Sequence, residues 1–372
     1  MGKAIERPVH GGDLESVIRS HIGATAWLDF SANINPAGPP PAVMDALRAA
    51  SGDPNVLTQY PTAYDRALTR ELARHHACEE AQVVVANGAS ALIEAFVRCV
   101  APRRCLVPQP AFSEYARALA AQGCKIVRFP LDPEADFQLD VDALIGTLER
   151  ERPEACIITN PHNPSGTAAT QTDMRRLLAC VNALGIALLL DEAFVDFAPT
   201  YSIAHDVLAT GGQVFVLRSL TKFYAIPGLR VGFGLAPAPF AGAIASRVPS
   251  WSITALAAIA AIAALGDEDF AQRTRATTVR SREHFTALLP PSVRAIPSVA
   301  NFLMLVVPGT STDLTGRLCS KHQIVVRDCA SYETLAGGPF IRVAVRSDED
   351  NARFAGILAH ELKGPISRHK QS

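Results

Sequence analysis

The sequence has no block of like charges, no long apolar run and no paired cysteine motif. Its 372 residues carry a formal net charge of only -1, and the one basic cluster, Arg368-His-Lys370, gives no indication of nucleic-acid binding. The start, MGKAIERPVHGGD, lacks the apolar core of a secretory signal, and the longest apolar run, residues 255–265, is too short to cross a bilayer. We therefore expect a cytoplasmic protein with neither a nucleic-acid nor a membrane partner.

Cysteine is present, but in no pattern that indicates a metal or disulfide framework. The eight cysteines are scattered without C-x-x-C pairs, so we expect reduced thiols and no metal site. A hydrophobic content of 48% over this length is enough for a large core and favours two domains. Residues 1–40 are rich in glycine and proline, which is typical of an arm, with turns at Gly11 and Gly12 and at Asn33 and Asn35.

Short apolar runs alternate with stretches of helical periodicity from residue 83 onward. These runs lack the polar alternation of a half-exposed strand, which predicts a mainly parallel sheet covered by helices on both faces. Ligands of such sheets bind at the carboxyl ends of the strands, so polar residues at those ends are the candidates for a site. The predicted strands are residues 83–86, 105–107, 125–129, 156–159, 186–190 and 214–217.

Lys222 follows the last of these strands, in the segment Ser219-Leu-Thr-Lys-Phe-Tyr-Ala-Ile-Pro-Gly-Leu-Arg230. A lysine held in a dry site has a lowered pKa, and its neutral amine reacts with aldehydes. The hydroxyls of Ser219 and Thr221 and the guanidinium of Arg230 are groups that bind a phosphate dianion. Together these residues indicate pyridoxal phosphate, although Lys222 alone fits a surface lysine equally well.

Other strand ends also carry polar groups. Asp191 follows the strand at 186–190, where a buried carboxylate needs a cation or a donor, such as a protonated pyridine nitrogen. Asn163 lies in the rigid turn Asn160-Pro-His-Asn-Pro-Ser-Gly166, which can aim its amide at a ring hydroxyl. Ala89 and Ser90 begin the helix after the strand at 83–86, where free backbone N–H groups favour phosphate. Taken singly, a structural salt bridge, a plain turn and a helix cap explain these residues as well.

The order and spacing of these motifs resemble the aminotransferase-like branch of fold-type I pyridoxal-phosphate enzymes along nearly the whole chain. The resemblance implies an α/β fold, with a large domain on a mainly parallel seven-stranded sheet sandwiched by helices and a smaller α+β domain. It implies a large domain at residues 41–255, a small domain at 256–372, and an arm at 1–40 that packs on the small domain and the active site. It also implies a homodimer with shared active sites.

The same resemblance assigns roles to residues of this sequence. Lys222 would bond to the aldehyde of pyridoxal phosphate and later handle a proton, and Asp191 would pair with the pyridine nitrogen. Asn163 would bind the ring hydroxyl, and Phe112 would stack on the ring. Tyr60 would reach the phosphate of the neighbouring subunit's cofactor. The other phosphate ligands would be Ala89, Ser90, Ser219 and Arg230.

The C-terminal part predicts the smaller domain, with strands at residues 302–307, 324–326 and 340–346. Alternation puts Arg342 and Arg346 on one face of the last strand, where an inward arginine suits a carboxylate, although exposed arginines on edge strands are common. One departure from the family pattern is Phe194, which stands where many of these aminotransferases have tyrosine. A hydroxyl contact to the ring oxygen is therefore missing.

Several segments resemble one subgroup, the threonine-phosphate decarboxylases of cobalamin biosynthesis. They are residues 10–12, 29–36, 191–197, 221–230, 327–329 and 341–346. This resemblance implies decarboxylation of L-threonine O-3-phosphate to (R)-1-amino-2-propanol O-2-phosphate and CO2. Arg342 would hold the substrate carboxylate, and the other substrate-binding residues would be His10, Asn33, Asn163 and Arg327.

Two other functions stay open at this point. The histidinol-phosphate aminotransferases are close relatives of that subgroup and also bind a phosphorylated substrate, so transamination is the alternative reaction. A non-catalytic sensor that keeps the fold is the third possibility. The lack of an appended helix-turn-helix or basic segment, together with the intact set of Lys222, Asp191 and Arg230, argues against a sensor.

Overall fold

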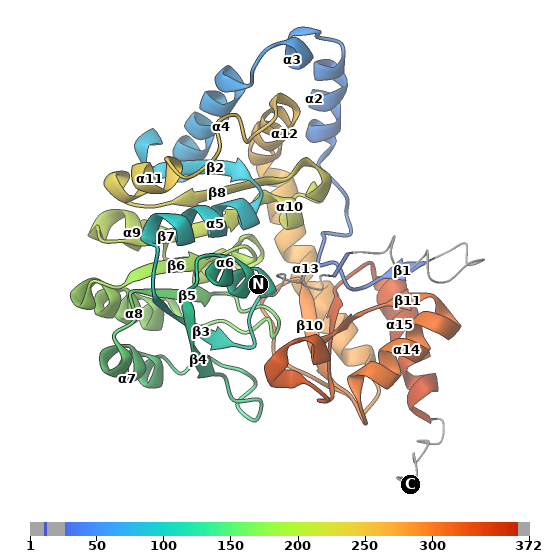
Figure 1. Ribbon diagram of the computed structural model, residues 1–372. Coiled ribbons are helices and arrows are strands. Elements are labelled where there is room, and N and C mark those ends of the chain that lie inside the picture. Colours follow the sequence, from blue (N-terminus) through green and yellow to red (C-terminus); the bar gives the residue numbers. More distant parts are fainter. Residues whose placement is uncertain (1–10, 13–26, 364–372) are drawn as a thin grey trace, which may run out of the picture.

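Seven strands form the larger sheet of the computed structural model, which describes residues 11–12 and 27–363 (Figure 1). The strand order is β2-β8-β7-β6-β5-β3-β4, and β8 is antiparallel to both of its neighbours while all other pairs are parallel. The predicted mainly parallel sheet is confirmed. Its strands are β2 (Val83–Asn87), β3 (Arg104–Gln109), β4 (Lys125–Pro130), β5 (Ala155–Thr159), β6 (Ala187–Asp191), β7 (Val214–Ser219) and β8 (Val231–Leu235).

Strand β8 was not predicted from the sequence, because two of its five residues are glycines. The structure shows why those glycines are needed. A Cβ on Gly234 would lie 2.0 Å from the Phe215 ring, and one on Gly232 would lie 2.6 Å from the backbone nitrogen of Ala89. Glycine therefore lets β8 pack closely against β7 and against the turn that follows β2.

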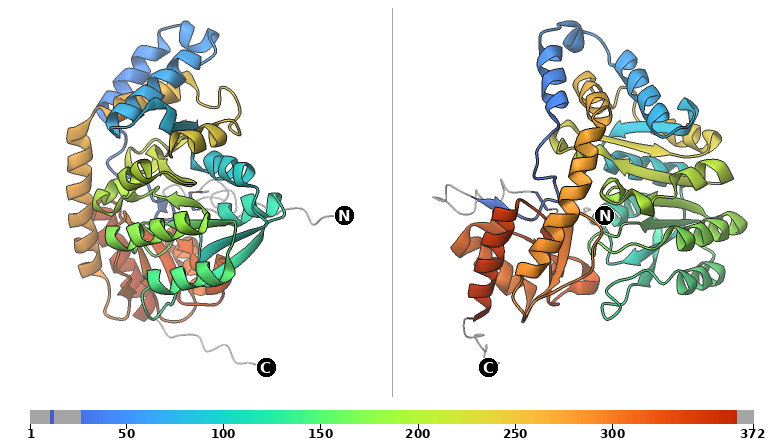
Figure 2. Two further views of the ribbon diagram at one scale, coloured as in Figure 1. Left: turned by 90° about the vertical axis from the view of Figure 1, so that its left-hand side faces the viewer. Right: turned by 180° about the vertical axis from the view of Figure 1, so that it is seen from behind.

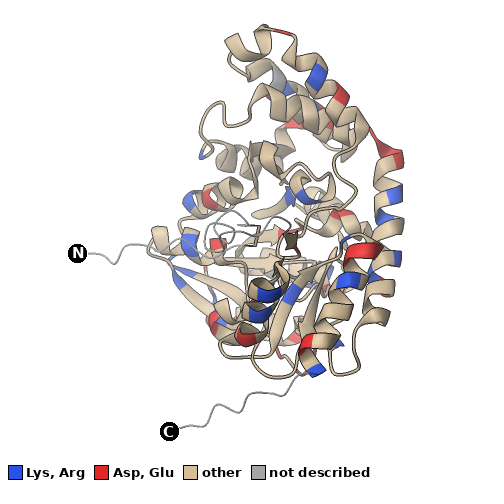
Figure 3. Cartoon of the chain, turned by 90° about the vertical axis from the view of Figure 1, so that its right-hand side faces the viewer, with Lys and Arg blue, Asp and Glu red and all other residues tan. Residues whose placement is uncertain are grey.

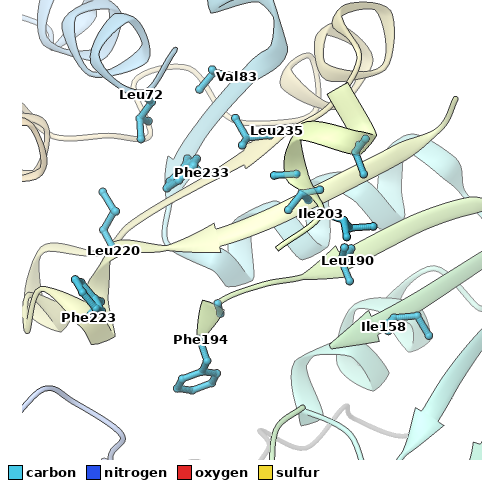
Figure 4. Packing of buried hydrophobic residues seen from close by; sticks show 14 of the residues in the cluster. Leu72, Val83, Ile158, Leu190, Phe194, Ile203, Leu220, Phe223, Phe233 and Leu235 are labelled. Atoms are coloured by element: carbon cyan, nitrogen blue, oxygen red, sulfur yellow. The ribbon is translucent and has the colours of Figure 1, made fainter. Parts of the chain in front are cut away.

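Helices cover both faces of this sheet, as predicted. Successive strand residues enter opposite hydrophobic clusters, so that Leu188 and Leu190 face one layer while Leu189 faces the other. Figure 4 shows part of the first layer, where Leu72, Phe233 and Leu190 come from α4, β8 and β6. That layer contains α4 (Thr62–His75), α7 (Val141–Glu151), α8 (Gln171–Leu184), α9 (Ala204–Thr210) and α12 (Ala255–Leu265), and the other contains α5 (Ala89–Val100), α6 (Ser113–Ala121) and α11 (Ala238–Ala245).

A second sheet lies apart from the first and is antiparallel, with the order β12-β13-β10-β9 (Figure 1). One of its faces packs on helices α14 and α15 through Leu303, Ile341 and Phe354. The predicted strands at 302–307 and 340–346 are confirmed within one or two residues. The elements here are β9 (Arg294–Ala295), β10 (Phe302–Val306), α14 (Ser311–His322), β11 (Ile324–Val325), β12 (Arg327–Asp328), β13 (Phe340–Ala344) and α15 (Asp348–Lys363).

The described part of the arm, residues 27–40, runs from the second sheet to the first. Strand β1 (Leu28–Asp29) pairs with β11, and Phe30 is buried against the rings of Phe285 and Phe354. Further along, the backbone N–H of Asn35 donates to the carbonyl oxygen of Lys222 at 3.0 Å. The arm therefore touches both the smaller sheet and the lysine-bearing turn.

Helix α13 (Glu268–Leu288) links the two sheets, as the view from behind in Figure 2 shows. The preceding helix α12 packs against α2 (Pro41–Ser51), α4 and the short α3 (Asn55–Thr58), all beside the larger sheet. The division into domains at residues 41–255 and 256–372 stays a prediction. By packing alone, the change from one sheet to the other falls within α13, because α12 buries its alanines against the larger unit.

Acidic and basic residues are interspersed over the described chain (Figure 3). Among the helices of residues 27–363, none combines the length and apolarity that crossing a membrane requires. In the same part of the chain, no group of three or more His, Cys, Asp or Glu side chains is arranged to hold a metal ion. All eight cysteines are free thiols.

Candidate active site

A cavity of about 250 Å³ lies between the carboxyl ends of the larger sheet's strands and the edge of the smaller sheet. Four cationic side chains line it, and none of its described lining residues is acidic. A larger cavity, of about 400 Å³, runs along α13, but its described lining holds no lysine, histidine or cysteine. Ten predicted site residues meet in the first cavity: Asn33, Ala89, Ser90, Phe112, Asn163, Ser219, Lys222, Arg230, Arg327 and Arg342.

Lys222 lies in the one-turn helix α10 (Leu220–Phe223), directly after β7. Its Nζ donates to Ser219 Oγ at 3.1 Å and lies 5.4 Å from the centre of the Phe194 ring. Burial lowers the pKa of this amine to about 8, an effect that the charge of Asp191 opposes and those of Arg230 and Arg342 reinforce. The lysine is therefore neutral far more often than an exposed one, as its predicted role requires.

The lowered pKa of Lys222 predicts how loading of an aldehyde cofactor depends on pH. Only the neutral amine attacks, and a pKa of about 8 makes roughly a tenth of it neutral at pH 7 and about nine tenths at pH 9. We expect the association rate of pyridoxal phosphate with the cofactor-free protein to rise about tenfold between these values, measured by stopped-flow absorbance. A flat profile would show that Lys222 is not the limiting amine.

Asp191 ends strand β6 and is buried, as predicted. Its Oδ2 accepts from the Tyr115 hydroxyl at 2.6 Å, and its Oδ1 accepts from the backbone N–H of Ala193 at 2.8 Å. Burial raises the pKa of the carboxyl, while Tyr115, Ala193 and Lys222 oppose that rise. The sequence predicted the need for a partner but did not identify Tyr115.

The next residue, Glu192, points away from the cavity. Its carboxylate accepts from Arg218 Nη1 at 3.1 Å, from Ser202 Oγ at 2.7 Å and from the backbone N–H of Ile203 at 3.0 Å. Arg218 also binds Asp196. This buried network fixes the backbone that follows Asp191. The two neighbouring carboxylates therefore bind different groups: Asp191 binds Tyr115, and Glu192 binds Arg218.

The N-terminus of α5 and the guanidinium of Arg230 form a cradle for an anion. Gly88 begins the helix with a φ of +81°, and a Cβ there would lie only 2.5 Å from Arg230 Nη2. Ser90 lines the cavity on the helix side, and Ser219 lines it from the end of β7. The free N–H groups, the hydroxyls and the guanidinium converge on the cavity as a phosphate requires.

Arg342 and Arg327 lie side by side on β13 and β12, as Cα partners across the sheet. Arg342 donates from Nη1 to Asn163 Oδ1 at 2.6 Å and from Nη2 to the Ser31 carbonyl at 3.0 Å, while its Nε has no partner among the described residues. Arg327 lies 5.4 Å from the centre of the Tyr332 ring. Both arginines are buried, and no carboxylate of the described chain is within ion-pair distance of either.

Arg346 does not share the site of Arg342. It follows the end of β13, where its Nε binds Asp350 at 3.0 Å and its Nη1 donates to the Asp29 carbonyl at 3.0 Å. The strand stops at Ala344, so the alternation that the sequence predicts does not continue to residue 346. Arg346 therefore fastens the arm to the smaller sheet.

The two asparagines predicted to make turns behave differently. Asn35 accepts from the backbone N–H of Ala37 at 3.1 Å, which confirms a turn there. Asn33 makes no such bond: its side chain lines the cavity, and its buried Oδ1 has no partner in the described chain. The turn interpretation is wrong for Asn33, because its side-chain oxygen accepts no backbone N–H of the described chain.

The profile of the family described as aminotransferase class I and II matches residues 25–358. The chain belongs to this family. It is 35% identical over 368 residues to the threonine-phosphate decarboxylase of Salmonella typhimurium, covering 97% of this chain and 98% of that protein. It is 29% identical over 364 residues to the histidinol-phosphate aminotransferase of Methanocella arvoryzae, covering 97% of each. The crystal structure of histidinol-phosphate aminotransferase from Sinorhizobium meliloti in complex with pyridoxal-5'-phosphate has a TM-score of 0.84 at 23% identity, over 97% of this chain and 95% of that one.

This member of the class I and II aminotransferase family has the fold-type I architecture, is an enzyme and uses pyridoxal phosphate. The residues of the cavity fit that cofactor. A cradle that a single added Cβ would fill matches the phosphate, and a lysine of lowered pKa matches the aldehyde. The residues that would hold the cofactor are Lys222, Asp191, Asn163, Phe112 and those of the cradle.

The cradle yields a prediction for this aminotransferase-family protein. The variant Gly88→Ala places a methyl group against Arg230 Nη2 and should weaken pyridoxal phosphate binding about 10- to 100-fold, the worth of a lost charge-assisted hydrogen bond. Equilibrium titration of the cofactor-free protein measures it. Gly123→Ala is the matched control, because Gly123 also has a positive φ but has no atom within 4 Å of its added Cβ. Equal losses in both variants would refute a specific role for the cradle.

Three predicted site residues do not line this cavity: Asp191, which is buried at the end of β6, Tyr60 and His10. Tyr60 is 74% exposed between α3 and α4 and stacks on Trp251, with ring centres 4.3 Å apart. Its predicted contact lies in a neighbouring subunit and stays a prediction. His10 falls outside the described residues, although the adjacent Gly11 lines the cavity, where a Cβ would lie 2.1 Å from the Ser31 carbonyl oxygen. Phe194 contributes only its ring, which packs edge-on against Phe302.

Proposed function

We propose that this enzyme decarboxylates L-threonine O-3-phosphate to (R)-1-amino-2-propanol O-2-phosphate and CO2, in cobalamin biosynthesis. The observation that carries the proposal is the pair of buried arginines, Arg327 and Arg342, which face one cavity without a carboxylate partner in the described chain. With Arg230 assigned to the cofactor phosphate, two cations remain for the substrate. A substrate with both a carboxylate and a phosphate satisfies both of them.

The protein's own groups divide the work of the proposed reaction. Bound pyridoxal phosphate supplies a conjugated ring that accepts the electron pair of a broken bond at the substrate's α-carbon. Arg342 binds the carboxylate with its remaining N–H donors, and Arg327, with the amide of Asn33, binds the phosphate. Lys222 Nζ is held in place by its hydrogen bond to Ser219, and with a pKa of about 8 it can accept a proton as the neutral amine or deliver one as the ammonium.

Orientation decides which bond breaks, because only a bond perpendicular to the ring plane feeds its electrons into the conjugated system. Arg342 holds the carboxylate from β13, while its Nη1 is also tied to Asn163. A second anchor at Arg327 fixes the other end of the substrate. Two fixed ends leave the substrate little rotation about its α-carbon, which favours loss of one chosen group.

Direct comparison of substrates tests the proposal. Purified, cofactor-loaded protein should release CO2 from L-threonine O-3-phosphate without any oxo-acid acceptor, and kcat/KM for unphosphorylated L-threonine should be at least about 10²-fold lower. Arg327→Ala should remove most of this discrimination while leaving kcat/KM for threonine nearly unchanged. Formation of glutamate from 2-oxoglutarate and histidinol phosphate, without CO2 release from threonine phosphate, would replace the proposal with transamination.

We also infer that the enzyme works in the cytoplasm as a homodimer in which Tyr60 serves the partner's site. The exposed rings of Tyr60 and Trp251, which stack on each other, and the exposed side chain of Leu57 support a contact there. Mixing Lys222→Ala with Tyr60→Ala subunits should restore about a quarter of wild-type activity, because half of the dimers are mixed and each has one intact site. No recovery above that of either variant alone would contradict a shared site.

A further inference from the structure

Tyr115 is buried and has no part in the proposed reaction. It lies in α6, one turn after Phe112, and only 1% of its surface is exposed. Its ring meets the Phe112 ring edge-on, with centres 5.7 Å apart and planes at 86°. The side chain therefore fixes the ring that would stack on the cofactor's face.

The hydroxyl of Tyr115 makes two hydrogen bonds, to Asp191 Oδ2 at 2.6 Å and to Thr159 Oγ1 at 2.9 Å. A phenol has one proton to donate, and a carboxylate can only accept. The proton of Tyr115 therefore points to Asp191, and Thr159 must donate to the Tyr115 oxygen. Thr159 and Asp191 are Cα partners at the ends of β5 and β6, so the two strands position this chain of hydrogen bonds.

The surroundings of Asp191 leave Tyr115 as its one side-chain hydrogen-bond donor among the described residues. The backbone N–H of Ala193 occupies Oδ1, and Lys222, from α10, acts through its charge. Glu192 faces the opposite side, where Arg218 pairs with it. With one donor on each oxygen, the carboxylate keeps a free lone pair on each for the ring nitrogen of the cofactor.

We propose that Tyr115 is a positioning residue that orients the Asp191 carboxylate toward the cofactor ring nitrogen and keeps it charged, while its ring fixes Phe112 on the ring face. One side chain thus positions both the carboxylate at the edge of the cofactor ring and the aromatic ring on its face. The proposal concerns cofactor binding, so it holds whether the enzyme decarboxylates or transaminates. Its failure and that of the proposed function are therefore separable.

The charge on Asp191 depends on this bond because burial opposes it. Burial raises the pKa of the Asp191 carboxyl, and the Tyr115 hydrogen bond is the first of the effects that oppose the rise. Without the hydroxyl, the carboxyl takes up a proton at a higher pH. A protonated Asp191 no longer stabilises a positive ring nitrogen. Without the Tyr115 hydroxyl, cofactor binding therefore begins to weaken at a higher pH as the solution is acidified.

The test is the variant Tyr115→Phe, which keeps the ring against Phe112 and removes only the hydroxyl. We expect the dissociation constant of pyridoxal phosphate at pH 7 to rise about 10-fold or more, and the acid limb of binding against pH to move about one unit higher. Titration of the cofactor-free protein measures both. Thr159→Val, which removes the upstream donor, should give a smaller shift in the same direction.

Two comparisons separate this role from packing. In an Asp191→Asn background, Tyr115→Phe should change the dissociation constant less than about twofold, because the charge that it supports is gone. Tyr224→Phe, at another buried tyrosine, should leave the pH limb in place. An unmoved acid limb in Tyr115→Phe, or equal losses in the wild-type and Asp191→Asn backgrounds, would overturn the proposal.

Discussion

Replacing Lys222 with alanine is expected to reduce turnover by at least about 10³-fold and to remove the absorbance band of the yellow imine from the cofactor-loaded protein. The variant loses both the amine that bonds to the aldehyde and the group that moves a proton at the substrate's α-carbon. No other described lysine lines the cavity. Absorbance spectra and single-turnover rates with L-threonine O-3-phosphate measure the two losses separately.

Lys222→Arg is the informative companion variant. It keeps a positive charge near Asp191 and Ser219 but cannot form the covalent bond, so it should be as inactive as Lys222→Ala. Lys125→Ala, at an exposed position of β4, is the control and should behave as wild type. Retained turnover in Lys222→Ala, beyond the tolerance of the assay, would remove this residue from its role.

Asp191→Asn is expected to lower kcat about 10²- to 10³-fold and, at neutral pH, to leave the cofactor-free protein as stable as wild type or more so. The activity falls because the ring nitrogen loses its charged partner. The stability does not fall because the pKa of Asp191 is raised in the folded protein. Such a group favours folding when protonated at low pH, and this contribution is lost as the pH rises through its folded-state pKa.

Thermal unfolding of the cofactor-free variant from pH 4 to pH 8, beside steady-state kinetics of the loaded enzyme, tests both halves. The advantage of asparagine over the native residue should grow as the pH rises. The asparagine oxygen can accept from the backbone N–H of Ala193 and its NH2 group can donate to the Tyr115 oxygen, so both contacts can be kept. A strong loss of stability of Asp191→Asn at pH 8 would mean that the charged carboxylate stabilises the folded protein, which would contradict this prediction.

Much of the larger sheet is predictable because its strands are buried on both faces. Continuous apolar runs such as residues 186–190 and 214–217 give a local signal, and the structure places strands there. Strand β8 gives no such local signal, because Gly232 and Gly234 are required there by close contacts with residues that are distant in the sequence. A close approach between distant segments leaves no periodic trace in the sequence.

The candidate site shows the same division. Lys222, Asp191 and Asn163 each follow a predicted strand, so their meeting at one edge of the sheet could be inferred from topology. The pairing of Arg327 with Arg342 depends on strand register in the smaller sheet, which the sequence does not specify. The role of Tyr115 could not be predicted from the sequence either, because a tyrosine at helical spacing is most often a core residue.

The central claim is that Lys222 carries the cofactor. Borohydride reduction of the loaded protein, followed by proteolysis and mass spectrometry of the peptides, tests it most directly, because reduction makes the bond permanent. We predict one modified peptide, spanning the turn after β7, with the added mass on the lysine at 222. A cofactor mass on Lys125, Lys321 or another lysine, with residue 222 unmodified, would contradict the account.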